Sequence, residues 1–565
     1  MRKKRYFIFF LLFQLSNIFS QNINYKKVKS DIFQDDYKES SIVLAEKNDD
    51  NEFLLVRSYK KGGISPGEGF YIEEYDTNLK LIKEFEYDMK HPNFQKYNLV
   101  LSIFTLEKTL HIIEIYYDLN LKSFVCLDNK VLDKSNVEKT ELFKISKEEM
   151  KTLGTFNLQK KFYARADELW TNDNAGTISA EDNNINNGTF LNVIFKGDSA
   201  KDGGDASDIT VVVNEAKTAF AICMDFNLKT SEGLKIYAYN NKLEKLIDYS
   251  FVKEIKDRNY VFQNIQISNK GTEVYLLAKS YDKELKKKKE GAKYLFEVTK
   301  IDNKMQLTQK IDPQDNFIGS LKTFFHKNEL ICLGFYSEFD DYRFKGICAF
   351  KFDVNSFTLK TSKYNLFTEQ FFLDKYGKGT EKAVKFLTFR NVFFNANDEI
   401  ILNAEEFNKY TQAGGAVGIN GGAGAISSST SYSFDDIIVA KLNSSGEMLW
   451  SRNINKKQST TDSDNSSFLS YTSTFRNDKT YIFINTKDKI KKLRNDRIEF
   501  GQIRKNKSNL NVIQVNENGD FEYEEILDSE ENEVPYMVSK GAIIDNSVYF
   551  LGRKGKNKQL LKVSL

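Results

Sequence analysis

Four residue types are scarce in this sequence. Its 565 residues include four prolines, four cysteines, three histidines and two tryptophans. The histidines, His91, His111 and His326, are too far apart for the paired spacing of a zinc site, and no histidine-based triad has identifiable partners. No C-x-x-C pair occurs, so a redox or zinc centre has no support. The sequence therefore predicts no catalytic, cofactor-binding or metal-binding residue.

The four cysteines, Cys126, Cys223, Cys332 and Cys348, all fall within expected strands. Cysteine is a common small buried hydrophobe, which favours free thiols. Cys332 and Cys348 flank residues 337–344 almost symmetrically, so they could instead face each other across one hairpin as a disulfide. Both interpretations stay open.

A charge of one sign is also absent. The chain has 82 Lys and Arg against 79 Asp and Glu, and four of the basic residues lie within Arg2–Arg5. Without that segment the chain is close to neutral, so composition does not indicate nucleic-acid binding. One dense cationic run, Lys286–Lys289, lies between Glu284 and Glu290 and is expected to be a solvated loop tip.

Carboxylates are plentiful but not arranged as catalytic pairs. Asp35-Asp36, Asp340-Asp341 and Asp435-Asp436 are adjacent in sequence, and adjacent side chains of a strand point to opposite faces. The stretches 173–176 and 198–205 are rich in Asp, Asn and Gly, but neither has the ligand series of an EF-hand. Solvated loops are the preferred interpretation of both, with calcium binding as the alternative.

The first twenty residues have the pattern of a secretory signal peptide. The basic Arg2–Arg5 precedes an apolar run from Tyr6 to Leu15, and Ser20 offers a small residue for cleavage. The run is too short to span a bilayer, no cysteine lies near it for a lipid anchor, and no other transmembrane segment is evident. The sequence thus predicts an exported protein of the periplasm, the cell surface or the extracellular space.

The most informative feature is a four-part phrase that recurs eight times. Each copy has an apolar strand, a tight polar turn, a second apolar strand, and then a hairpin of two more strands. Such a unit cannot bury its faces alone, and four-stranded copies arrayed radially make a β-propeller. The apolar runs imply burial on both faces. The second strands are 53–56, 110–115, 219–223, 274–277, 330–334, 400–403, 481–484 and 548–551.

These copies predict an all-β fold, a single propeller domain over residues 21–565 with eight blades, or seven if one copy is an appendage. The eighth copy ends with its third strand, 560–565, at the end of the sequence. Because an unpaired sheet edge is a liability, we expect Ile23–Phe33 to close the ring as the missing outer strand. A free N-terminal tail is the alternative.

Two insertions interrupt the repeat, at about 171–208 and 412–433. The second is rich in glycine and serine, and lacks the Lys-Ser/Thr that a phosphate-binding loop requires. Glycine and serine at this density indicate a flexible connection. It is expected to be a mobile spacer, with a binding loop as the alternative.

The stretch Asp435–Trp450, DDIIVAKLNSSGEMLW, resembles the repeat of exported β-propeller proteins common in Bacteroidota. The glycine-rich insertion before it is similar too, and 346–355 and 511–519 match loosely. This resemblance implies a propeller fold and transfers no active site, because the family is largely uncharacterised. WD, kelch and Asp-box signatures are absent.

Two classes of function follow. The first is a non-enzymatic binding or scaffold propeller of the cell envelope, a monomer that recognises a protein or glycan. The alternative is a propeller enzyme, a glycan hydrolase or lyase, with its site at the mouth of the central channel. The lack of an acid/base pair or metal-ligand set favours the first, and a cluster of converging carboxylates, His or Tyr would favour the second.

Overall fold

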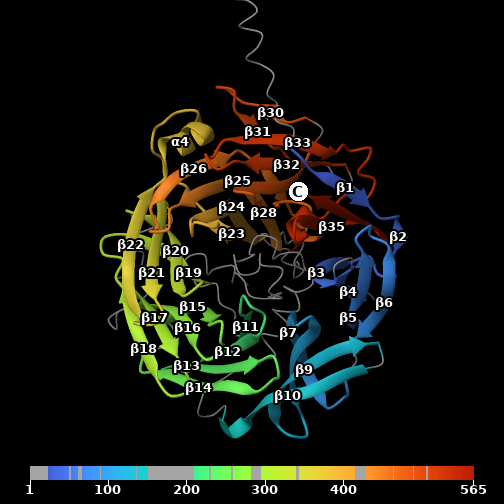
Figure 1. The fold of residues 1–565 in the computed structure, drawn as a ribbon, viewed down its shortest axis with the longest axis vertical. Coiled ribbons are helices and arrows are strands. Elements are labelled where there is room, and N and C mark those ends of the chain that lie inside the picture. Colours follow the sequence, from blue (N-terminus) through green and yellow to red (C-terminus); the bar gives the residue numbers. More distant parts are fainter. Residues whose placement is uncertain are drawn as a thin grey trace, which may run out of the picture.

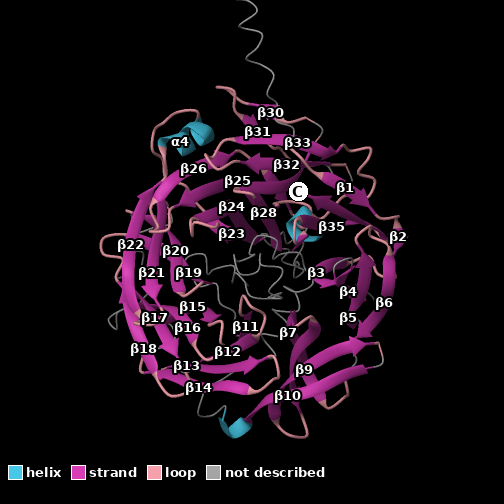
Figure 2. Cartoon of the chain, viewed as in Figure 1, coloured by secondary structure: helices cyan, strands magenta, loops and turns pink. Residues whose placement is uncertain are grey.

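The computed structural model describes residues 23–49, 52–61, 67–89, 91–134, 136–149, 209–227, 231–255, 259–281, 294–338, 343–413, 428–461, 463–487, 489–503 and 507–565. Eight antiparallel sheets are arranged in a ring around a central axis (Figure 1). Among the described residues, helix occurs in short segments in the connections, namely residues 147–149, α4 (Glu369–Tyr376), α5 (Ser463–Ser466) and the 3-10 turn η5 (Val538–Lys540) (Figure 2). The fold is the predicted eight-bladed β-propeller.

Each blade has four main strands, from the axis outward. Blades 1 to 4 are β3 (Ser40–Asp49), β4 (Glu52–Lys61), β5 (Gly67–Asp76), β6 (Leu81–Asp88); β7 (Gln95–Leu106), β8 (Thr109–Asp118), β9 (Ser123–Asp133), β10 (Asn136–Ser146); β11 (Ile209–Val213), β12 (Ala219–Asn227), β13 (Glu232–Asn240), β14 (Lys245–Lys253); and β15 (Tyr260–Ile267), β16 (Val274–Tyr281), β17 (Tyr294–Ile301), β18 (Gln306–Ile311).

Blades 5 to 8 are β19 (Phe317–His326), β20 (Glu329–Ser337), β21 (Gly346–Asp353), β22 (Thr358–Leu366); β23 (Leu387–Phe394), β24 (Ile400–Ala413), β25 (Ser428–Leu442), β26 (Met448–Ile454); β28 (Thr472–Arg476), β29 (Lys479–Thr486), β32 (Asn509–Val515), β33 (Phe521–Leu527); and β34 (Ala542–Ile544), β35 (Ser547–Lys554), β36 (Asn557–Ser564), β1 (Lys26–Lys29). Additional short strands are β2 (Phe33–Gln34) on β36, β27 (Gln458–Thr460) on β25, and the hairpin β30 (Lys491–Lys492) with β31 (Ile498–Glu499). Each of the eight second strands predicted from the sequence is the second strand of a blade in the structure.

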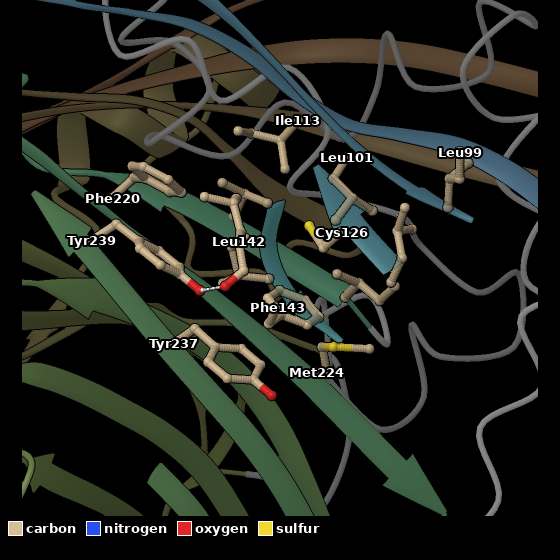
Figure 3. Packing of buried hydrophobic residues seen from close by; sticks show 14 of the residues in the cluster. Leu99, Leu101, Ile113, Cys126, Leu142, Phe143, Phe220, Met224, Tyr237 and Tyr239 are labelled. Carbon is tan, nitrogen blue, oxygen red and sulfur yellow. Dashed lines mark hydrogen bonds between the residues drawn. The ribbon is translucent and has the colours of Figure 1, made fainter. Parts of the chain in front are cut away.

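The apolar runs are buried on both faces because each blade packs against two neighbours. In β12, Phe220 and Ile222 join a core cluster with blade 2, whereas Ala221 and Cys223 join a cluster with blade 4. Figure 3 shows the first of these clusters, in which the Tyr239 hydroxyl also donates to the carbonyl of Leu142 at 2.8 Å. Each large side chain buried in this way stabilises the fold by about 2 kcal/mol.

In three blades, a lysine of the third strand ties the blade to the next one. The Nζ atoms of Lys300, Lys351 and Lys562 donate to carbonyl oxygens in the following blade's outer turn, at 3.0, 2.6 and 3.1 Å. In the four outer turns after Lys300, Lys351, Lys441 and Gln514, an Asp or Asn two residues later accepts backbone N–H bonds and fixes the turn. Lysine side chains of the strands and Asp or Asn side chains of the turns therefore both help to hold neighbouring blades in place.

The N-terminal segment closes the ring, as predicted. β1 pairs antiparallel with β36, Lys26 opposite Ser564 and Lys29 opposite Leu561, and β2 pairs with the start of β36. Ile23 is buried in the core between blades 7 and 8. We call residues 23–40 the clasp.

Charged side chains fasten the clasp to both adjoining blades. Asp35 accepts from Arg57 Nη1 of blade 1 at 2.7 Å and lies 3.7 Å from Lys558 Nζ of blade 8. Arg57 also pairs with the buried Glu73. The Lys558 ammonium further donates to the carbonyls of Lys38 and Gly555.

The four cysteines are buried free thiols. Cys332 lies opposite Phe350, and Cys348 lies opposite Gly334, so the two do not face each other directly across the hairpin. Burial raises the thiol pKa of both, which makes them unreactive hydrophobes.

Of the expected insertions, 171–208 lies outside the described residues, as does the expected signal peptide 1–20. The flanks of the expected insertion 412–433 are strands, because Ala413 pairs with Ser428 at the end of a long β24–β25 hairpin. Residues 414–427 lie outside the described residues.

Candidate functional site

The two faces of the ring differ in their connections. On one face, which we call the tight-turn face, turns join the first strand to the second and the third to the fourth, and the longest spans 268–273. The other face, the loop face, carries the connections from second to third strands and from each blade to the next; they include short turns such as 119–122 and longer described segments at 367–386, 463–471 and 528–541. Loops on a rigid scaffold carry binding and catalysis more often than its strands do. The loop face is therefore where a site is expected.

Neighbouring blades tie the tight-turn face together. Asp398 of blade 6 accepts from His326 Nε2 of blade 5 at 2.9 Å, and Asn395 reaches Asp478 of blade 7 at 3.4 Å. Lys47 of blade 1 pairs with Asp545 of blade 8 at 3.2 Å. Such ties leave little freedom for this face to adapt to a ligand.

On the loop face, α4 is fixed over blade 6. Its Phe371 and Phe372 are buried in the core between blades 5 and 6. Its Asp374 accepts from Arg452 Nε of β26 at 2.6 Å. The helix ends at Gly377, whose φ of 69° is the left-handed conformation that glycine adopts readily.

Beneath the end of α4, one lysine holds two carboxyl groups from different strands. Lys375 Nζ lies 2.9 Å from Glu406 Oε2 of β24 and 2.5 Å from Asp436 Oδ2 of β25. Asp436 also accepts from Asn453 Nδ2 and from the backbone N–H of Lys456. The side chains of Glu406 and Asp436 are 18% and 14% exposed, so protons can reach them.

The surroundings of Glu406 disfavour its charged form. Burial, together with the charges of Asp436 and Asp435, raises the pKa of Glu406 to about 7, although Lys375 opposes the rise. Burial opposes the charge on Lys375, but the two carboxylates outweigh it and raise the lysine pKa. Near neutral pH the triad therefore holds a proton on Glu406 that it can release.

A deeper ion network lies next to this triad and is fully enclosed. Glu405 pairs with Arg390, lies 2.7 Å from Lys456 Nζ, and accepts from Ser470 Oγ at 2.8 Å. Burial would raise the pKa of Glu405, but Arg390 and Lys456 together lower it, so it stays ionised. These charges are internally compensated and stabilise one arrangement of blade 6.

The β30–β31 hairpin packs against the end of α4. Arg497 Nη1 donates to the carbonyl of Lys375 at 2.8 Å, and Asn495 Nδ2 donates to the carbonyl of Gly377 at 3.0 Å. Two connections that are distant in sequence, 367–386 and 487–508, thus form one continuous part of the loop face beside blades 6 and 7 (Figure 1). This part of the face is our candidate functional site.

The first strands, nearest the axis, carry amide and hydroxyl groups that bond between blades. Asn264 of β15 pairs with Thr323 of β19, and Ser473 of β28 donates to Asn391 of β23 at 2.7 Å. Among the described residues no group of three or more His, Cys, Asp or Glu side chains could hold a metal ion. The converging carboxyl groups of Glu406 and Asp436 lie in the middle of the long strands β24 and β25, and Glu406 is opposite Leu387 of the innermost strand β23.

Several of the residues that the sequence singled out lie in the described part of the structure, and each contacts other groups of the protein. His111 is buried with its Nδ1 2.8 Å from Asp128, His326 stacks on Phe394, and burial lowers the pKa of His91. In blade 6, Asp436 binds Lys375. Burial raises the pKa of Asp435, and the charge of Lys456 opposes this rise. Residues 173–176, 198–205, 286–289 and 340–341 lie outside the described residues.

Sequence reasoning missed Lys375, Glu406 and the 487–497 hairpin. Glu406 and Asp436 are thirty residues apart, and only the strand register brings their carboxyl groups to one lysine. The hairpin did carry a readable signal, since Lys487, Lys489, Lys491, Lys492, Arg494 and Arg497 lie within eleven residues.

No protein-family model matches this chain, and no curated protein matches it in sequence. Solved structures similar to it include an apocarotenoid oxygenase mutant of Synechocystis, at 8% identity and a TM-score of 0.30 over 95% of this chain and 93% of that one. Another is prolyl oligopeptidase B of Galerina marginata, at 7% identity and a TM-score of 0.35 over 91% and 55%. A third is the hydrazine synthase of Kuenenia stuttgartiensis, at 9% identity and a TM-score of 0.27 over 57% and 74%. Similarities this low carry no argument about function.

In the part of the chain that the structure describes, no helix has the length and apolar character needed to cross a membrane.

Proposed function

We propose that this chain is an exported, non-enzymatic binding propeller of the cell envelope, a monomer that recognises a protein or glycan partner through its loop face. The resemblance of Asp435–Trp450 to exported propeller repeats of Bacteroidota, and the signal-like first twenty residues, support the location. The function rests on one observation, the segregation of the long connections to one face.

That segregation has a physical interpretation. Short turns that hydrogen-bond to the turns of neighbouring blades make the tight-turn face a rigid frame. The loop face bears connections far longer than strand reversal requires, and two of them are held in place by Arg497 and Asn495. A preorganised surface loses little conformational entropy on binding, which favours recognition as the role of these connections.

The test is affinity capture from the native envelope with the mature protein. In one variant, Asn-Gly replaces residues 414–427, because Ala413 and Ser428 are paired and a two-residue turn can close their hairpin. The matched control carries Lys→Glu changes at Lys80, Lys242, Lys270 and Lys304, exposed residues of tight-turn-face turns.

We expect the wild type and the control to capture the same partner, and the variant without residues 414–427 to lose it. If the control loses the partner and the loop-face variant keeps it, or if no form captures a specific partner, a loop-face binding function is contradicted.

The alternative, a glycan hydrolase or lyase, is supported by one observation. Glu406, with a pKa of about 7, lies with Asp436 around Lys375, and a carboxyl group that titrates near neutral pH can serve as a general acid or base. Both groups are bound by Lys375, which favours an anchoring role. Turnover of an envelope glycan that Glu406→Gln abolishes, while the fold and partner capture are kept, would establish the enzyme instead.

A further inference from the structure

The candidate site bears a set of exposed cations. Among the described residues, no acidic side chain lies within ion-pair distance of any of them, and one of them, Lys382, lies 5.0 Å from the Tyr376 ring. We call this set the basic surface; its members are Lys378, Lys382, Lys385, Lys487, Lys489, Lys492 and Arg494.

The basic surface is held in place. Its first part follows directly after α4, and its second part belongs to the β30–β31 hairpin. Arg497 and Asn495 join the two by hydrogen bonds to the carbonyls of Lys375 and Gly377, and Lys491 pairs with Glu499 across the hairpin at 2.9 Å. These contacts use one arginine and one lysine for structure and leave the remaining cations facing solvent.

The local charge is strong although the chain is neutral. Residues 377–386 and 487–499 together carry nine Lys or Arg against Glu381, Asp488, Asp496 and Glu499. Like charges held close together repel, and an anionic ligand that lies across them removes this repulsion and releases counterions. A surface of this kind attracts a chain that carries repeated negative charges.

The composition of the basic surface distinguishes among polyanions. Six of its seven members are lysine, and protein interfaces are depleted in lysine and enriched in Trp, Tyr, Met and Arg. Single-stranded nucleic acid needs several aromatic platforms for its bases, but Lys382 covers the Tyr376 ring and leaves Phe386 as the strongly exposed ring in the described parts of 367–386 and 487–503. The strongly exposed large apolar side chains in these described parts are Leu373 and Phe386, too few for the apolar face with which proteins enter a membrane surface.

We propose that the basic surface binds a linear anionic polysaccharide, a glycan chain with carboxylate or sulfate groups at regular intervals. The lysines act as mobile point charges, so affinity depends on charge density more than on one sugar ring's stereochemistry. This inference rests on the proposed binding function and names the class of its partner.

The experiment measures binding of the mature protein to polygalacturonate and dextran sulfate by isothermal titration calorimetry, from 50 to 300 mM NaCl. Neutral dextran, single-stranded DNA, and vesicles of phosphatidylcholine with and without phosphatidylglycerol are the comparison ligands. The test variant combines Lys487→Glu, Lys489→Glu, Lys492→Glu and Arg494→Glu. The control is the tight-turn-face variant with Glu at positions 80, 242, 270 and 304, which has the same net charge change.

We expect the wild type and the control to bind the anionic polysaccharides, with affinity falling as salt rises, and neutral dextran not to bind. The test variant should bind about tenfold or more weakly, with a reduced salt dependence. Equal loss in both variants would mean that net charge and not this surface is responsible, and would overturn the proposal. Preferential binding of DNA or of anionic vesicles would overturn it as well.

A second variant with Lys487→Gln, Lys489→Gln, Lys492→Gln and Arg494→Gln guards against misfolding of the charge-reversed variant. Native melting with weakened polysaccharide binding supports the proposal, and unchanged binding contradicts it. If no polysaccharide binds while the envelope capture still yields a partner, this inference fails and the proposed function stands.

Discussion

Asp35 offers the sharpest test of how the ring is closed. The carboxylate comes from the clasp and is almost fully buried, between Arg57 Nη1 at 2.7 Å and Lys558 Nζ at 3.7 Å. Removing one member of a buried ion pair typically costs about 3 to 5 kcal/mol, because the remaining charge loses its compensation. Arg57 keeps Glu73, so we expect Asp35→Ala to fall near the lower value, about 3 kcal/mol.

This free energy can be expressed as a melting temperature. The entropy of unfolding is about 2 cal/mol/K per residue, so a cooperative ring of this size has roughly 1 kcal/mol/K in total. The melting temperature should therefore fall by about 3 °C for Asp35→Ala. The adjacent Asp36→Ala is the control, because Asp36 is exposed, and it should shift melting by less than 1 °C.

The assay is differential scanning calorimetry at a fixed scan rate, at pH 7 and at pH 9.5. Burial lowers the pKa of Lys558 to about 8, although Asp35 opposes the shift. At pH 9.5 this lysine is mostly neutral in wild type and variant alike, so the loss of Asp35 should matter less there. Equal melting of Asp35→Ala and Asp36→Ala at pH 7 would refute the argument that the clasp is fastened by this carboxylate.

Three other predictions concern the ring and the candidate site. Deleting residues 23–34 should expose the edge of β36, so that hydrogen exchange of Asn557–Ser564 amides accelerates strongly while β20 stays protected. Glu406 has a folded pKa of about 7 against an ordinary 4.5, so its contribution to stability is complete below 4.5 and is lost as pH rises through 7; the difference is about 3 kcal/mol. Glu406→Gln should therefore raise melting at pH 8 but not at pH 5, whereas Glu381→Gln on the exposed loop should do neither. Gly519 has φ +87° with the Trp450 ring 2.9 Å from the position of a Cβ, so Gly519→Ala should cost about 2 kcal/mol or more in chemical denaturation. Gly555 has φ +64° and open space, so Gly555→Ala should cost about 1 kcal/mol.

The sequence predicted the ring because its signal is local and repeated. Runs such as Leu330–Gly334 and Tyr481–Ile484 are strands in any context, and turns such as Asn443–Gly446 reverse the chain through their own side chains. The missing outer strand also followed from the copies themselves. The repeat motif has a structural meaning, since Trp450 at its end donates to the carbonyl of Glu517 and covers Gly519 of the next blade.

The candidate site could not be predicted in the same way, because its residues meet only through register and packing. Lys375 comes from a helix that breaks the repeat, and its carboxyl partners come from two strands. Asp436 shares its lysine with Glu406 of the other strand, and not with its sequence neighbour Asp435. Net charge was uninformative too, because it averages over the whole chain.

The balance of charge over the whole chain conceals an uneven distribution within blade 7. Its 487–499 connection is basic, whereas residues 517–533, along its outer strand and the turn beyond, contain nine acidic residues and no basic one. The acidic stretch is partly used by the clasp, since Lys27 pairs with Glu531 at 2.9 Å and the backbone N–H of Ile23 donates to Glu524 at 3.0 Å. In the described part of the chain, no acidic side chain pairs with Lys487, Lys489, Lys492 or Arg494 of the basic connection. On this blade, Glu524 and Glu531 therefore help to close the ring, whereas these four cations face solvent on the loop face. That difference is why we assign recognition to the basic surface and a structural role to the acidic strand.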